Sequence, residues 1–155
     1  MPLAPRHNKP KIALDAIGAA GVYFVVMRLS PHNLVALPTI RNTAGIDVLV
    51  STSDGSPLAA LQVKTSQKRV TGWPTPAPGK CLTAKNAYYV FLRWIKDRDM
   101  FEGFLVHGRE VRAQVARNLE AKRWRGSKPF PAWHLPFDPS EQARLREAWE
   151  NWTPR

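Results

Sequence analysis

The sequence predicts an α/β domain with a central mixed sheet of four to five strands flanked by helices. Two apolar, β-branched runs at 45–52 and 57–65 meet at an Asp-Gly turn, which is a strong hairpin signal. Two further apolar runs, 87–95 and 101–107, predict strands that are joined by a charged turn. A helical pattern at 109–125 follows them, so strands and helices alternate along the chain.

Length and charge limit the class of protein. The chain has 155 residues, and residues 1–155 are expected to form one domain with a sizeable core. A net charge of +11 and a pI near 10.4 make a polyanion the expected partner, nucleic acid before an anionic membrane surface. The single cysteine, Cys81, excludes an internal disulfide and is typical of a reducing cytoplasm, which is the expected location.

The chain opens with a basic, proline-containing arm at 1–11 and continues with an uncharged apolar run at 16–27. The run is too short to span a bilayer and lacks a signal-peptide cleavage pattern, so a buried helix is the better interpretation. Ser30-Pro31 should end this helix, because a residue before proline avoids the helical region. A short strand at 34–37, closed by Pro38, is expected next.

The turn at Asp54-Gly55 determines how the two strands of the hairpin pair. A two-residue turn there, or a four-residue loop around it, places Asp47 opposite Gln62. Lys64 lies two positions beyond Gln62 and shares its face, so a carboxylate, an amide oxygen and an ammonium group converge. A three-residue bulged turn would shift this pairing and turn Asp47 away from Gln62.

These three side chains suit metal-assisted phosphodiester hydrolysis. Asp47, the Gln62 side-chain oxygen and the Val63 backbone carbonyl are oxygen ligands for a hard divalent ion such as Mg²⁺. Lys64 would orient the attacking water or neutralise charge that builds up on phosphorus. The alternative is a half-buried hairpin whose Asp and Lys form an ion pair at a sheet end.

The run Gly45-Ile46-Asp47, followed by Gln62-Val63-Lys64-Thr65-Ser66, resembles the PD-(D/E)XK nuclease superfamily. The Gln-x-Lys variant is similar to modification-dependent restriction enzymes and to small Holliday-junction-resolvase-like proteins. The resemblance covers about residues 12–115 and implies a restriction-endonuclease-like fold, a Mg²⁺ or Mn²⁺ cofactor, and catalytic roles for Asp47, Gln62 and Lys64.

One element departs from the family pattern. Such families usually carry a Glu on the first helix, about where Val22 stands in this chain. Asp15 is the only acidic residue before Asp47, and it lies on the same helix face two turns earlier. That separation is roughly 10 Å along the helix axis, so Asp15 is not expected to replace the missing Glu.

A long loop, 66–86, leaves the hairpin with several cations around Trp73. One interpretation is a clamp on a phosphate backbone, with Trp73 stacking on an exposed base. The other, favoured for Trp73 itself, is a proline-stiffened surface loop whose Trp packs on the core. The candidate contacts of this loop are Lys68, Arg69, Trp73, Lys80 and Lys85.

The helix predicted at 109–125 has a narrow apolar stripe of Val111, Val115 and Leu119. Its remaining surface is strongly basic, which favours either a nucleic-acid contact or a solvated face. The candidate contacts are Arg109, Arg112, Arg117 and Arg123.

The C-terminal segment, 129–155, should form an extended aromatic strap followed by a final helix. Asp138 is the expected N-cap, with Pro139 in the first turn and Glu141 at the capping-box position. Leu145, Trp149 and Trp152 follow at helical spacing and should be its buried edge.

The resulting hypothesis is a nucleic-acid-binding protein that acts as a Mg²⁺-dependent endonuclease, with DNA favoured over RNA and no membrane contact. The first alternative is a binding module that keeps the nuclease fold without catalysis. The second is a protein-interaction component of a defence or toxin system. The resemblance leaves room for a homodimer.

Overall fold

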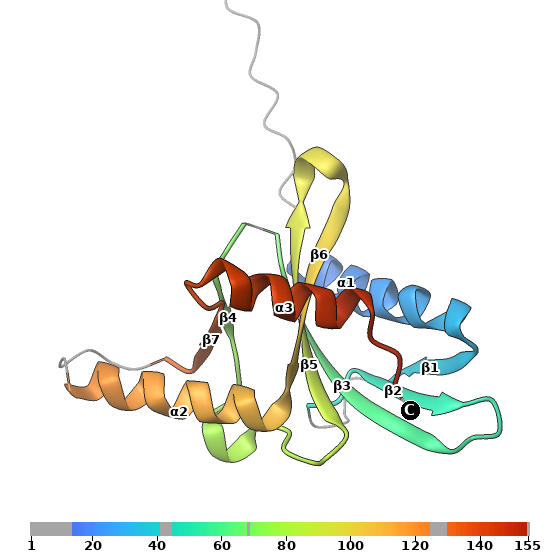
Figure 1. Cartoon of the computed structure of the whole chain (residues 1–155), viewed down its shortest axis with the longest axis horizontal. Helices are drawn as coiled ribbons and strands as arrows, with labels where there is room; N and C mark the ends of the chain where they lie inside the picture. Colours follow the sequence, from blue (N-terminus) through green and yellow to red (C-terminus); the bar gives the residue numbers. More distant parts are fainter. Residues whose placement is uncertain (1–13, 41–44, 68, 125–129, 155) are drawn as a thin grey trace, which may run out of the picture.

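The computed structural model describes residues 14–40, 45–67, 69–124 and 130–154, and Figure 1 shows the arrangement of their elements. The basic arm expected at 1–11 lies outside the described residues. In chain order the elements are α1 (Leu14–Leu29), η1 (Ser30–His32), β1 (Leu34–Pro38), β2 (Val48–Thr52), β3 (Pro57–Ser66), β4 (Gly72–Pro74), η2 (Pro78–Lys80), β5 (Ala87–Ile95), η3 (Lys96–Arg98), β6 (Met100–His107), α2 (Gly108–Trp124), β7 (Ala132–His134) and α3 (Pro139–Glu150).

The central sheet has five strands in the order β1-β2-β3-β5-β6. The β3–β5 pair is parallel and the other neighbours are antiparallel, so the predicted mixed α/β fold is confirmed. The chain returns from the end of β3 to the start of β5 through the segment that contains β4 and η2. No helix among the described residues is long and apolar enough to cross a membrane.

Both faces of the sheet are covered near β5. On one face, Val90 and Leu92 pack in a core shared with α1 and α3. On the other face, Tyr89 and Phe91 pack in a core shared with α2, β4 and β7. Burial on both faces explains why the sequence of β5 is an almost continuous apolar run and does not alternate between apolar and polar residues.

Helix α1 ends at Leu29 and is followed by the Ser-Pro step, as predicted. Gly21 lies against Thr65 of β3, where an added Cβ would overlap the threonine hydroxyl. The glycine therefore lets α1 approach the sheet closely. At the other end of the chain, Asp138 caps α3 by accepting a hydrogen bond from the Ser140 N–H at 2.9 Å, also as predicted.

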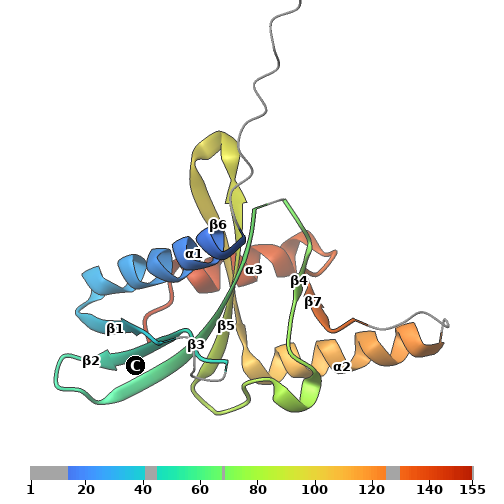
Figure 2. The ribbon, with the colours of Figure 1, turned by 180° about the vertical axis from the view of Figure 1, so that it is seen from behind.

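The expected 66–86 loop contains a strand that sequence reasoning missed. Strand β4 pairs antiparallel with β7, and Trp73 stands opposite Trp133. Figures 1 and 2 both show β4 and β7 side by side beside α2, away from the β2–β3 hairpin. Trp73 is 1% exposed and its indole N–H donates to the Leu92 carbonyl at 2.9 Å. The base-stacking interpretation of Trp73 is therefore wrong and the packing interpretation is correct.

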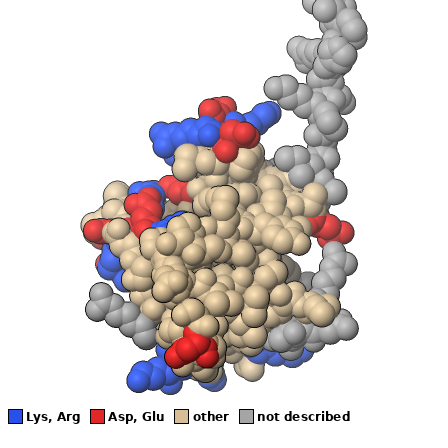
Figure 3. Space-filling model, turned by 90° about the vertical axis from the view of Figure 1, so that its right-hand side faces the viewer, with Lys and Arg blue, Asp and Glu red and all other residues tan. Residues whose placement is uncertain are grey.

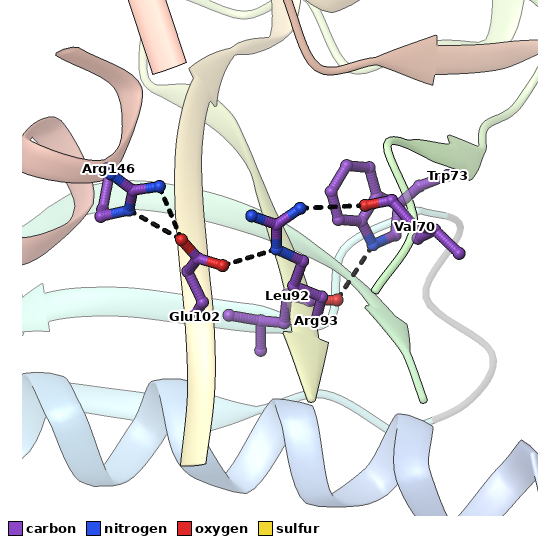
Figure 4. A network of polar contacts seen from close by, with 6 residues as sticks. All are labelled: Val70, Trp73, Leu92, Arg93, Glu102 and Arg146. Carbon is purple, nitrogen blue, oxygen red and sulfur yellow. Dashed lines mark hydrogen bonds and ion pairs between the residues drawn. The ribbon is translucent and has the colours of Figure 1, made fainter. Parts of the chain in front are cut away.

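A polar network ties α3 and the segment before β4 to the sheet (Figure 4). Glu102 of β6 accepts hydrogen bonds from Arg93 of β5 at 2.5 Å and from Arg146 of α3 at 2.8 Å. Arg93 also donates to the Val70 carbonyl at 3.2 Å. Because Arg93 is only 6% exposed, its charge depends on Glu102 for compensation.

Replacing Glu102 with Gln should lower the free energy of unfolding by about 3 kcal/mol at neutral pH, because a buried arginine loses its counter-charge. Burial alone would raise the pKa of Glu102, but hydrogen bonds and charges from Arg93 and Arg146 hold it below its ordinary value. A carboxyl whose pKa falls on folding stabilises the fold above its unfolded pKa of about 4.3. This contribution disappears as the pH falls through the lower, folded pKa.

Urea unfolding of the parent and Glu102→Gln at several pH values measures the effect. The difference should be complete above about pH 5 and shrink below about pH 4. The control is Glu141→Gln, which removes an exposed ion pair with Arg144 and should change stability by less than about 0.5 kcal/mol. Equal losses in both variants would contradict the role assigned to Glu102.

Candidate active site

The β2–β3 hairpin keeps the predicted register in the half that carries the candidate site. Val48 pairs with Leu61, as expected. Nearer the turn, Ser51 pairs with Pro57, and the register shifts by one residue between Val50 and Ser51. Such a shift is what an extra residue in one strand produces.

The turn itself is the bulged, three-residue type that would have displaced the register. The Thr52 N–H donates to the Ser56 carbonyl and the Gly55 N–H donates to the Thr52 carbonyl, both at 3.0 Å. Gly55 has a φ of +88°, which glycine tolerates. The extra residue of β3, Leu58, restores the original register beyond it. The three-residue turn and the extra residue in β3 therefore offset each other, and the pairing from Val50 to Val48 is the predicted one.

Asp47 sits just outside the regular ladder. Its N–H donates to the Leu61 carbonyl at 2.8 Å, and its carbonyl accepts from the Thr39 N–H at 2.9 Å. Because Leu61 already pairs with Val48, Asp47 is an additional residue at this end and does not stand directly opposite Gln62 as predicted. Its carboxylate Oδ2 accepts a hydrogen bond from the Val63 N–H at 2.7 Å. The carboxylate is thus fixed at the edge of β3.

Asp47 borders a cavity of about 440 Å³ between α1 and the sheet. The described wall of this cavity includes Asp15, Val22, Asp47 and Val63. Asp15 reaches the same space although it is two helical turns from Val22, because the cavity extends along α1. Val22 lines the same cavity from the helix side.

Gln62 and Lys64 are not part of the described cavity wall. Side chains alternate along a strand, so these two lie on the opposite side of β3 from Val63. Gln62 stands beside Tyr89 and Lys64 beside Phe91 in the pairing with β5. Asp47 and Val63 therefore line the same cavity, whereas the side chains of Gln62 and Lys64 lie on the other face of the sheet.

Two properties make the Gln62 region unusual. Gln62 is 6% exposed, and its Oε1 has no hydrogen-bond partner among the described residues. Burial raises the pKa of the neighbouring Tyr89, and the negative charge of Asp47 adds to this effect. The charge of Asp47 therefore also acts on Tyr89, which lies beside Gln62 in the sheet.

Four of the predicted phosphate contacts gather around the start of α2. Arg109 donates to the Thr83 carbonyl at 3.0 Å, and η2, which ends at Lys80, contacts α2. The Lys85 carbonyl interacts with the His107 ring at 3.0 Å, just before α2 begins. We call the set the basic cluster; its members are Lys80, Lys85, Arg109 and Arg112.

Arg112 of the basic cluster and Lys64 both act electrostatically on Cys81. Burial raises the pKa of the Cys81 thiol, and the positive charges of Arg112 and Lys64 both oppose that rise. One thiol therefore lies within electrostatic range of a cation from α2 and of the candidate catalytic lysine. All four members of the basic cluster are exposed.

Other predicted contacts lie elsewhere. Arg69 shares a separate cavity with Asp97 and Arg98 at the far end of β5, roughly 26 Å from the start of that strand. Arg117 borders a cavity between α2 and α3. Lys68 and the side chain of Arg123 lie outside the described residues. The expected basic surface is therefore divided rather than continuous.

No protein-family model matches the chain, and no curated protein sequence matches it significantly. One matching solved structure is that of a bacterial homing endonuclease, I-Ssp6803I, with a TM-score of 0.49 and 15% sequence identity over 88% of each chain. Similarity at this level establishes neither a family nor a substrate for this chain.

The bond from Val63 to Asp47 predicts a graded response to substitution. Asp47→Leu should cost about 1–3 kcal/mol of stability, because the Val63 N–H loses its acceptor. Asp47→Asn keeps an acceptor oxygen and should cost clearly less. Hydrogen exchange at the Val63 amide, measured by NMR, should accelerate in the Leu variant only. Unchanged protection in Asp47→Leu would show that the bond does not hold this edge.

Proposed function

We propose that the protein binds nucleic acid, DNA before RNA, and hydrolyses phosphodiester bonds with a divalent cation at Asp47. The observation that carries this proposal is the Asp47 carboxylate, which accepts a hydrogen bond from the Val63 N–H and lines a cavity. On the other face of β3, the amide of Gln62 is buried, and its oxygen has no partner among the described residues. A buried oxygen without a donor is costly unless a cation or water satisfies it.

The available donors fit a hard cation. Asp47 offers a carboxylate oxygen, and Val63 offers a backbone carbonyl that points to the same strand edge as its N–H. The Gln62 amide oxygen, on the other face of β3, would reach the same cation across this edge. Mg²⁺ and Mn²⁺ prefer such oxygen ligands. The described residues contain no group of three His, Cys, Asp or Glu side chains that could hold a metal. The proposed site therefore depends on neutral oxygens more than on charge.

Each residue has a distinct task in the proposed reaction. The bound cation would polarise the phosphate and lower the pKa of a water molecule. The Val63 N–H keeps the carboxylate of Asp47 in one orientation. Lys64 orients the attacking water or neutralises the charge that builds up on the phosphate oxygens. The basic cluster holds the polyanion next to Lys64 by attraction to its phosphates.

The PD-(D/E)XK resemblance of the Asp47 and Gln62-Val63-Lys64 pattern supports the proposal independently of any structural match. A second candidate is a nucleic-acid-binding module without catalysis. It is favoured by Val22, which puts an apolar side chain on the cavity wall where the family carries a carboxylate. A protein-interaction role would require that neither binding nor cleavage is found.

Cleavage assays distinguish the first two candidates. Purified protein with plasmid, branched DNA or RNA should show slow cleavage in Mg²⁺, faster cleavage in Mn²⁺ and none in EDTA. Asp47→Ala should abolish cleavage, and Lys64→Ala should reduce it at least tenfold while binding is retained. The control is Asp97→Ala, on the distant β5–β6 turn, which should leave cleavage unchanged. Full activity of Asp47→Ala would overturn the site.

If the parent protein shows no cleavage, a gain-of-function variant tests whether the site is correctly placed. Gln62→Glu combined with Val22→Glu adds two carboxylates around the proposed cation. If the parent site is degenerate but correctly placed, calorimetry should detect tighter Mg²⁺ binding, and plasmid nicking should accelerate. A folded double variant with neither gain would show that Asp47 does not mark a nuclease site.

Binding should depend strongly on salt, since the chain carries a net charge of +11. Each neutralised phosphate contributes about −0.9 to the slope of log K against log salt for duplex DNA. Replacing Lys85, Arg109 and Arg112 together with Ala should make the slope shallower by about 2 to 3. The matched control is the distant Arg69→Ala and Arg98→Ala pair, which should change it little. Equal effects would show that charge alone, without a defined surface, drives binding.

A further inference from the structure

Helix α1 is apolar on both of its sides. One side packs against the sheet through Ile17, Val25 and Leu29, all buried. The opposite side carries Tyr23 and Met27, which are 65% and 63% exposed. A helix that covers a sheet on the surface of a protein normally presents polar residues to water, whereas residues 16–27 contain no charged side chain. The outer side of α1 is thus built like a contact surface.

The exposed residues form a stripe at helical spacing, which we call the outer stripe; it consists of Ala16, Ala20, Tyr23 and Met27. The side chains in its N-terminal half are small, and those in its C-terminal half are large. Figure 3 shows the face of the molecule that includes the C-terminal end of α1 and the β2–β3 hairpin. Charged side chains lie mainly around the rim of this face and leave its centre free of them.

We propose that the outer stripe packs against the outer stripe of a second copy, with the two helices antiparallel about a two-fold axis. This arrangement sets Ala16 of one copy opposite Met27 of the other and Ala20 opposite Tyr23. Each large side chain then meets a small one, as close packing requires. A parallel arrangement would oppose large to large and leave gaps between the alanines.

The charge distribution favours contact at the stripe. Residues 16–27 carry no charged side chain. Arg28, the next cation along the chain, donates to the Trp149 carbonyl at 3.1 Å, so its guanidinium is turned toward α3 and away from the stripe. An uncharged stripe is where two copies with a net charge of +11 each repel least.

The contact would border the candidate active site. Asp15, Ala19 and Tyr23 belong to the wall of the Asp47 cavity as well as to the exposed part of α1. A second copy would therefore hold Tyr23 in place beside the cavity mouth. One pair of helices buries less than the area of a standard interface, so the dimer should form at tens of micromolar protein or above. The proposal does not depend on phosphodiesterase activity.

Sedimentation velocity over a range of protein concentrations tests the association. The parent should shift from monomer to dimer, and Tyr23→Glu should raise the dissociation constant at least tenfold. The matched control is Leu49→Glu, at an exposed apolar residue of β2, which should leave association unchanged. A parent that stays monomeric at several hundred micromolar would overturn the proposal. So would Leu49→Glu weakening the dimer as much as Tyr23→Glu does.

Cross-linking tests the orientation. In a Cys81→Ala background, Ala16→Cys and Met27→Cys are prepared separately and treated with a short bis-maleimide alone or mixed. Antiparallel packing predicts cross-linked dimers mainly in the mixture. Efficient cross-linking of either variant with itself would exclude the antiparallel arrangement. Binding of monomers to anionic vesicles, without self-association, would assign the stripe to a lipid surface instead.

Discussion

The pairing of β3 constrains the position of every candidate site residue. On one side β3 runs antiparallel to β2, and on the other it runs parallel to β5. Its odd-numbered residues, such as Leu61 and Val63, must therefore enter the core beneath α1. A slip of one residue would turn Lys64 into that core, at the desolvation cost of a buried ammonium group. The apolar pattern of β3 thus determines which face Gln62 and Lys64 occupy.

Local patterns predicted most of the fold because the interactions behind them are local. The alternation in β3, the Asp-Gly turn and the Asp138 cap each act within a few residues. The two irregularities of the hairpin were not predictable in the same way. Whether Leu58 is bulged, and whether Asp47 stays in the ladder, depends on hydrogen bonds to backbone groups outside the turn. Thr39, which binds the Asp47 carbonyl, carries no sequence signal for this role.

Long-range partners account for the remaining differences. Trp73 lies in a proline-containing segment that resembles a loop, and it becomes a strand only because Trp133 pairs with it from far along the chain. Long-range structure also explains why the predicted basic residues do not form one continuous surface. Arg69 and Lys85 belong to one loop in sequence, yet they lie near opposite ends of β5 because the loop runs the length of the sheet. Charge composition predicts a polyanion partner without locating its surface.

The structure assigns charge and apolar surface to different faces of the same sheet. The basic cluster and Lys64 lie on the α2 side, whereas the Asp47 cavity opens beside α1. The Asp47 carboxylate is held at the strand edge between them by the Val63 N–H. Attraction of a polyanion therefore requires no metal at Asp47, while hydrolysis would require that the cation and the held phosphate meet at this edge. In the proposed function, binding and catalysis therefore rest on different residues, so binding is expected to persist where catalysis is lost.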